Sequence, residues 1–439
     1  MVHLATSSAI ALGINLYNVD DDMVLTSKEA RCRLWYSLFT LEHQLSTITG
    51  RPSCLTNSLS AYAPLPVEES QYYDFWKVQL DGDPLLRQKF LAWTLYQDQD
   101  QDVRFQSQRL KSLTANPPLY FFYIVDLSII AQAISTRMYG ASPLENWVQV
   151  ERQVDFYAKK LDIWQSRIID QFSIAADNGS LSREKTSLTM HYYSARIMLS
   201  RLCLSGPGIN RQTTIVFPLS RLGYDQALVC IKSALSLIAN LPEEPDFKWL
   251  YAYSPWWIML HFLMQVAIVL LMQLSLGLLP TENRSSCEDH GKGNDDIWEI
   301  LVTIPLACQK VLRWLRSVAV VDQTWQRGSR MCDDLFRRVT SAKQLEARVL
   351  QCFAPLLVTD SSSPHASELL SPSSTEPHSS PINAHSSTTA AENPGFQSDP
   401  DEPYKQKYLF PYNPLLYSDA TWLSSILAPE RAPNTGHNL

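Results

Sequence analysis

The pattern of apolar and polar positions along residues 26–52 is typical of one amphipathic helix followed by a turn that ends it. Leucine and isoleucine recur there in steps of four and three residues, at Leu34, Leu38, Leu41, Leu45 and Ile48. That spacing predicts an apolar stripe on one helix face, packed into a core. Thr26 and Glu29 have the spacing of a capping box that starts a helix, whereas Gly50 and Pro52 end one.

Apolar helical spacing recurs throughout residues 1–355, and alternating strand patterns are scarce, so the sequence predicts one large all-α domain. Breaker residues predict an irregular connection at 53–83. Further helices are expected at 85–113, 119–139, 144–172, 181–204, 220–240, 295–320 and 325–352. The N-terminal segment is expected to form a helix with Leu4, Ile10 and Leu12 facing inward. It has no Lys or Arg before its apolar run, unlike a signal peptide.

The segment from Pro255 to Leu279 is apolar and has no Asp, Glu, Lys or Arg, which by hydropathy alone nominates a membrane span. His261, Gln265 and Gln273 lie along it, and such polar side chains are rare inside membranes. A helix that is apolar on all sides is also expected at the centre of a large helical domain. We therefore expect a buried core helix and no membrane contact.

The composition changes after residue 355. Residues 356–403 are rich in Ser, Pro and Thr and almost lack large apolar residues, which predicts a disordered linker. Residues 404–439 bring aromatic and leucine residues back. An acid followed by apolar residues on one helix face predicts a short activation or docking motif, formed by Asp419, Trp422, Leu423, Ile426 and Leu427. The alternative is a C-terminal helix that docks onto the helical domain.

The order of charged and aromatic residues within 26–52 resembles the signature of the fungal-specific transcription factor domain. This domain is the middle homology region of fungal zinc-cluster (Zn2Cys6) regulators. The residues that carry the resemblance are Glu29, Arg31, Arg33, Trp35, Tyr36, Glu42, Gly50, Arg51 and Pro52. The chain departs from the usual pattern at Cys32, Tyr36, Glu42 and His43, where the family usually has Arg, Trp, Asp and Arg.

The resemblance implies a regulator of RNA polymerase II transcription in a fungal nucleus, with partners in the transcription machinery or among coactivators. Members of the family bind DNA through a separate zinc cluster, usually as dimers, and some respond to a small-molecule effector. The eight cysteines of this chain are scattered, without C-x-x-C spacing, so the cluster is absent. Zinc and DNA contacts are therefore expected only in a module missing from this sequence, which begins inside the family domain.

The formal net charge of −7 and the lack of a basic block make the chain itself a poor nucleic-acid binder. Arg31, Arg33 and Arg51 are expected to make structural ion pairs, and Arg51 is expected to pair with Glu42. The helix within 26–52 is thus expected to stabilise the core, with no DNA-binding residues on it.

Recognised catalytic motifs are absent: the sequence has no G-x-S-x-G, H-E-x-x-H, G-x-x-x-x-G-K-[ST] or G-x-G-x-x-G. Its nine histidines lack metal-ligand spacing, and His191 and His261 are expected to be hydrogen-bonded core residues. We therefore expect no enzyme, and no catalytic residue, metal or cofactor in this chain. Two alternatives stay open: a corepressor or other interaction protein without DNA binding, and a membrane-associated protein anchored by 255–279.

Overall fold

The computed structural model describes residues 2–16, 22–55, 61–97, 100–140, 144, 146–174, 182–205, 220–276, 293–321 and 323–342. These residues belong to one folded unit. Its regular secondary structure is helical, with no β-strand in the described ranges, so the predicted all-α class is confirmed. The predicted linker at 356–403 and the tail at 404–439 lie outside the described residues.

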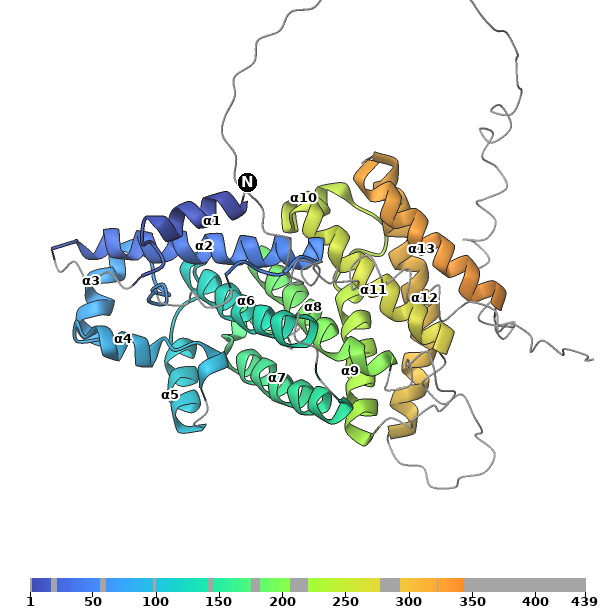
Figure 1. The fold of residues 1–439 in the computed structure, drawn as a ribbon, viewed down its shortest axis with the longest axis horizontal. Coiled ribbons are helices and arrows are strands. Elements are labelled where there is room, and N and C mark those ends of the chain that lie inside the picture. Colours follow the sequence, from blue (N-terminus) through green and yellow to red (C-terminus); the bar gives the residue numbers. More distant parts are fainter. Residues whose placement is uncertain are drawn as a thin grey trace, which may run out of the picture. The chain divides into compact units, whose positions relative to one another are not determined.

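The main helices of the N-terminal half of the unit are α1 (Val2–Ala11), α2 (Leu25–Thr49), α6 (Pro117–Tyr139), α7 (Trp147–Arg167) and α8 (Arg183–Ser205). α1 packs against α2, and α2 contacts α6, which in turn contacts α7 and α8 (Figure 1). Short elements fill the connection from α2 to α6: Glu69–Gln71, α3 (Tyr72–Asp74), Phe75–Gln79, α4 (Pro84–Phe90), Thr94–Tyr96 and α5 (Asp100–Lys111). A 3-10 turn, Asp170–Phe172, follows α7.

The C-terminal half contains α9 (Arg221–Ala239), α10 (Phe247–Tyr253), α11 (Trp256–Leu276), α12 (Gly293–Val321) and α13 (Gln323–Ala342). α11 contacts α8, α9, α12 and α13, so it lies at the centre of this half (Figure 1). α8 packs along α9, and this pairing joins the two halves into one core.

Three helices among the described residues, α6, α9 and α11, are long and apolar enough to cross a membrane by length and composition. Their most apolar stretches are 72%, 44% and 78% buried inside the fold, respectively. Neighbouring helices therefore cover most of the apolar surface of α6 and α11. For α11, this packing agrees with the core helix expected at 255–279.

The leucine stripe predicted for α2 is wrong. Leu34 is 49% exposed and Leu41 is 36% exposed, whereas Trp35, Tyr36 and Phe39 on the adjacent face are completely buried. Both faces of this helix carry apolar residues, so periodicity alone does not decide between them. Aromatic side chains remove more apolar area from water than leucines do, and the aromatic face is the one that enters the core.

The predicted start of α2 is wrong as well. The helix begins at Leu25, and the residue before it, Val24, makes no side-chain capping bond. Glu29 does not reach back to the helix start, because its carboxylate is buried and bound by Arg87. The predicted end is confirmed: Gly50 has a φ of 65°, and the N–H of Arg51 donates to the carbonyl of Ser46 over 3.0 Å.

Helix α1 forms where it was expected, but its inward face differs. Leu4 and Leu12 are 67% and 70% exposed, Ile10 is 43% exposed, and the buried residues are Thr6 and Ala9. α1 packs against α2, and small side chains allow two helix backbones to approach closely. The small residues therefore occupy the interface, and the large apolar ones lie outside it.

The single helix predicted at 85–113 is divided into α4, a short 3-10 turn and α5. The division has a physical reason: the backbone N–H of Thr94 donates to the Asp126 carboxylate over 2.8 Å, and its hydroxyl donates over 2.7 Å. An N–H inside a continuous helix would be used by the helix itself. The connection predicted to be irregular at 53–83 also contains helical turns between Glu69 and Gln79.

Candidate functional site

A buried ion pair on α2 is the centre of the signature region. Oε2 of Glu29 accepts a hydrogen bond from Arg87 over 2.7 Å, and the two side chains are 0% and 2% exposed. Oε1 of Glu29 accepts from the backbone N–H of Leu65 over 2.6 Å and from Arg33 over 3.3 Å. Arg87 also donates to the carbonyl of Ala63 over 2.6 Å. These bonds hold the 61–67 segment against α2.

Two signature arginines near the start of α2 also bind backbone carbonyl groups. Arg33 donates to the carbonyls of Leu65 and Val67 over 3.0 and 3.2 Å, and Arg31 donates to the carbonyl of Gly13 over 3.1 Å. The arginines of α2 therefore fasten the segments before and after the helix. Arg33 also forms an ion pair with Glu29, as expected, whereas Arg31 binds a backbone carbonyl and forms no ion pair among the described residues.

Aromatic packing completes this region. Trp35 and Tyr36 are completely buried, and the Tyr36 hydroxyl donates to the carbonyl of Ala61 over 2.8 Å. The Tyr36 ring meets the Trp93 ring edge to face, with 5.0 Å between ring centroids. Tyr36, at a position where the resembled family usually has tryptophan, thus gains a hydrogen bond that fixes the 61–67 segment.

Glu42 holds the turn that follows α2, and the predicted ion pair with Arg51 is wrong. Its carboxylate accepts from the Ser46 hydroxyl over 2.8 Å, the Ser53 hydroxyl over 2.6 Å and the Cys54 backbone N–H over 3.0 Å. Burial raises the pKa of Glu42, but these hydrogen bonds outweigh burial and the pKa lies below its usual value. Glu42 is therefore an ionised, buried carboxylate, whereas Arg51 and Pro52 are exposed.

A second buried ion pair was missed by the sequence analysis. Arg167 lies 3.6 Å from the Asp126 carboxylate, and both side chains are 1% exposed. Arg167 also donates to Gln106 over 2.8 Å. Burial outweighs Arg167 and the hydrogen bonds from Thr94, so the pKa of Asp126 lies above its usual value. The signal for this site was available, because Asp126 is the one acid inside the apolar run LYFFYIVDLSII.

Three histidines from three helices line one cavity of about 50 Å³: His43 of α2, His191 of α8 and His261 of α11. A hydrogen bond of 2.8 Å joins His191 Nδ1 to the Ser187 carbonyl, as expected for a core histidine. His261 is half-buried, and its buried Nε2 has no hydrogen-bond partner in the part of the chain that the structure describes. Burial lowers the pKa of His43 to about 4, that of His261 to about 3, and that of His191 as well.

This cavity is small beside the roughly 300 Å³ or more of a metabolite site, so it does not by itself provide the effector pocket that the resemblance implies. A larger, open hollow of about 560 Å³ lies along α13, lined by Arg327, Arg330 and Arg338 among others. Its described lining comes from one helix, which gives no convergent set of groups around a ligand.

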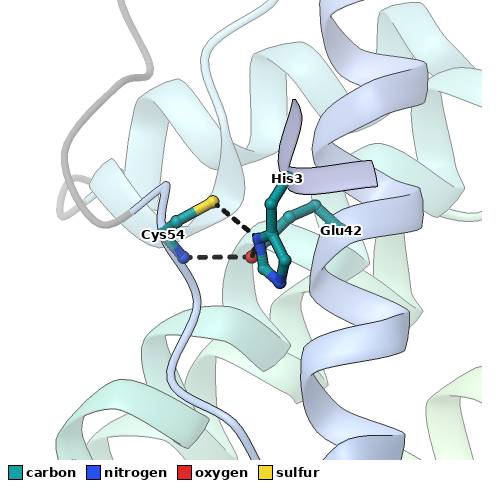
Figure 2. A group of neighbouring side chains, drawn as sticks. All are labelled: His3, Glu42 and Cys54. Carbon is teal, nitrogen blue, oxygen red and sulfur yellow. Dashed lines mark hydrogen bonds and ion pairs between the residues drawn. The ribbon is translucent and has the colours of Figure 1, made fainter. Parts of the chain in front are cut away.

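A histidine and a cysteine meet at Glu42 (Figure 2). His3 Nδ1 lies 3.2 Å from Cys54 Sγ and 3.8 Å from Glu42 Oε1. A catalytic triad needs one ring nitrogen at the nucleophile and the other at the acid, but here the same nitrogen faces both groups. Burial, followed by the Glu42 charge, also raises the pKa of the Cys54 thiol to about 11. The arrangement is therefore unsuited to cysteine nucleophilic catalysis.

The predicted activation or docking residues lie outside the described residues: Asp419, Trp422, Leu423, Ile426 and Leu427. Of the signature residues, Glu29, Arg33 and Tyr36 are brought together around the 61–67 segment. Glu42 and Gly50 shape the turn one helix length away, and Arg51 and Pro52 face solvent. The signature residues thus form two groups on α2, one that holds the 61–67 segment and one that holds the turn after the helix.

No family model matches this chain, so its resemblance to the fungal-specific domain stays a hypothesis, and no solved structure matches it. The chain is 36% identical over 369 residues to a protein of Aspergillus niger described as "Transcription regulator galc". The match covers 77% of this chain but 43% of that protein, so the chain spans less than half the length of the curated relative it matches.

Proposed function

We propose that this chain is a helical regulatory part of a fungal transcription regulator that acts in the nucleus. The observation that carries the proposal is the similarity to the Aspergillus niger transcription regulator across most of the chain. The signature order on α2 supports the finer proposal that the helical unit is a middle homology region of the zinc-cluster type. Such a unit would act on RNA polymerase II transcription.

The contacts of three arginines support the proposal that this chain does not itself contact DNA. Arg31, Arg33 and Arg87 donate to backbone carbonyls and to Glu29 inside the fold, so they are not available to phosphates. The net charge of −7 also opposes binding to a polyanion. We infer that DNA contact belongs to a zinc module outside this sequence, and that this chain acts through protein partners, among them a second copy of itself.

The C-terminal tail is the part that we propose for those partners. Helical spacing would place Trp422, Leu423, Ile426 and Leu427 on one face of a short helix beginning near Asp419. A segment with this pattern can fold into an apolar groove of a coactivator or of the transcription machinery.

Rapid depletion of the protein in its own cells tests the proposal. We expect the synthesis of a defined set of messenger RNAs to change soon after depletion, before secondary effects accumulate. The fluorescently labelled protein should be nuclear. Unchanged transcript synthesis, together with labelled protein in a membrane fraction that resists carbonate extraction, would instead support the membrane-associated alternative.

A mobility-shift assay tests whether this chain itself contacts DNA. Purified residues 1–439 should show no sequence-selective binding at nanomolar concentration, because the net charge is −7 and Arg31, Arg33 and Arg87 are used inside the fold. Sequence-selective binding in that range would show that the chain reads DNA itself.

A reporter fusion tests the tail. Residues 400–439 joined to a heterologous DNA-binding domain in yeast should activate transcription, and Leu423→Ala should reduce the activity. Ser424→Ala, at a position that helical spacing places off this apolar face, is the matched control. If the fusion is inactive and Trp422→Ala destabilises the intact protein, the tail is a docked C-terminal helix.

A further inference from the structure

Three ligand atoms of different chemistry meet beside α2. They are His3 Nδ1 from α1, Glu42 Oε1 from α2 and Cys54 Sγ from the turn after α2, and all lie within 4.8 Å of one another (Figure 2). The residues are far apart in the sequence, with His3 and Cys54 separated by 51 positions. We propose that His3, Glu42 and Cys54 bind one divalent cation of the zinc class.

The distances fit a tetrahedral ion. Bonds of about 2.0 Å to nitrogen or oxygen and about 2.3 Å to sulfur place neighbouring ligand atoms of zinc roughly 3.3–3.8 Å apart. His3 Nδ1 lies 3.2 Å from Cys54 Sγ and 3.8 Å from Glu42 Oε1. A cation can therefore enter between these atoms with only small side-chain movements.

The charge at Glu42 also favours a cation. Its three hydrogen-bond donors, the hydroxyls of Ser46 and Ser53 and the N–H of Cys54, are neutral. The other two buried acids described above, Glu29 and Asp126, each face an arginine. Glu42 forms no ion pair with a lysine or arginine among the described residues, and a buried carboxylate without a countercharge is costly.

The mixture of ligands selects the metal. A thiolate, an imidazole and a carboxylate suit zinc, whereas magnesium and calcium take oxygen ligands. On binding, the Cys54 thiol forms a sulfur–metal bond and releases its proton to solvent. Oε1 already accepts two hydrogen bonds, and the Ser46 hydroxyl can turn to the backbone carbonyl one helical turn earlier.

The site is open on one side. The His3 side chain is 54% exposed and Glu42 is completely buried, so a cation can reach the carboxylate from solvent past the imidazole. Three protein ligands leave the fourth position to water. Because the ligands come from three segments, the metal would fasten α1 to α2 and to the turn that follows. This site is separate from the six-cysteine cluster of the resembled family.

Cobalt titration of metal-free residues 1–439, purified without a polyhistidine tag, tests the proposal. We expect one Co2+ per chain with a thiolate-to-cobalt charge-transfer band, and displacement of Co2+ by Zn2+. Cys54→Ser should abolish the band, and Cys54→Ser and His3→Gln should each weaken binding by about 100-fold. Metal should slow amide hydrogen exchange in α1 by about tenfold in the parent protein but not in Cys54→Ser.

The matched controls are Cys287→Ser and His365→Gln, which should leave the titration unchanged. Cys54 and His3 are both exposed, so their replacements should keep the parental circular dichroism and denaturation midpoint. Absence of a thiolate band overturns the proposal. Binding that survives Cys54→Ser and depends on His3 alone also overturns it, because such binding would come from the N-terminal segment without the other two ligands.

Discussion

The Arg87 guanidinium donates to Glu29 over 2.7 Å across a separation of 58 positions in the chain. Both side chains are buried, and Arg87 also holds the carbonyl of Ala63. The pair therefore joins three parts of the unit: α2, the 61–67 segment and α4. An acid at the start of a helix, which looks like a capping residue in the sequence, is a buried anchor in the fold.

Breaking this pair should destabilise the protein strongly. Arg87→Met removes the buried charge partner of Glu29 and leaves only the longer, partly exposed pair with Arg33, and breaking a buried pair typically costs about 3–5 kcal/mol. Urea denaturation of the purified chain measures the loss. The control is Arg313→Met, which breaks the more exposed pair with Glu244 and should cost less than about 1 kcal/mol. Similar losses for the two variants would contradict the anchoring role of Glu29 and Arg87.

The two faces of α2 should differ in their sensitivity to truncation. Phe39 is completely buried, so Phe39→Ala should lower the free energy of unfolding by about 3–5 kcal/mol. Leu41 is 36% exposed, and Leu41→Ala should cost less than about 1 kcal/mol. The same denaturation assay compares them. A larger loss for Leu41→Ala would restore the leucine stripe as the packed face.

Acid should destabilise the fold through the histidine cavity. His43 is buried and His191 and His261 are half-buried, and loss of solvent around the rings holds the pKa values of all three below the ordinary value of 6.5, at about 4 for His43. The unfolded chain therefore binds more protons below pH 6.5, and stability falls as the pH drops from about 6.5 towards about 4. Each histidine contributes at most about 1.4 kcal/mol per pH unit in that window.

Denaturation midpoints measured across that pH window check the effect. The variant His261→Leu, which removes one of the three groups, should show a shallower loss of stability with falling pH. Protonation of Asp126 has the opposite effect on stability, because its raised pKa makes the folded state bind a proton more readily than the unfolded chain does. A flat profile for the parent protein, or an unchanged slope in His261→Leu, would argue against neutral histidines in this cavity.

Local sequence signals predicted much of the helical framework. Helices α6, α8, α9 and α11 occupy the segments in which helices were predicted, α6 and α11 from long apolar runs, and Gly50 ends α2 in the left-handed conformation. These features depend on residues near one another in the chain, such as a glycine after the last turn or an apolar run of sufficient length.

The pairing of buried charges could not be predicted in the same way. Glu29 meets Arg87, and Asp126 meets Arg167, only because tertiary packing brings separate helices together. The cluster of His3, Glu42 and Cys54 likewise draws one residue from each of three segments. Periodicity also failed on α2, where apolar residues occur on two faces and the larger aromatic side chains decide which face is buried.

The central claim is that this chain regulates transcription when another module brings it to DNA. Reporter transcription with residues 1–439 tethered through a heterologous DNA-binding domain tests it most directly, with Arg87→Met as the variant that disrupts the helical unit. We expect the tethered chain to change transcription several-fold relative to the DNA-binding domain alone, and Arg87→Met to alter that output. Equal transcription from all three proteins at equal abundance would contradict the account.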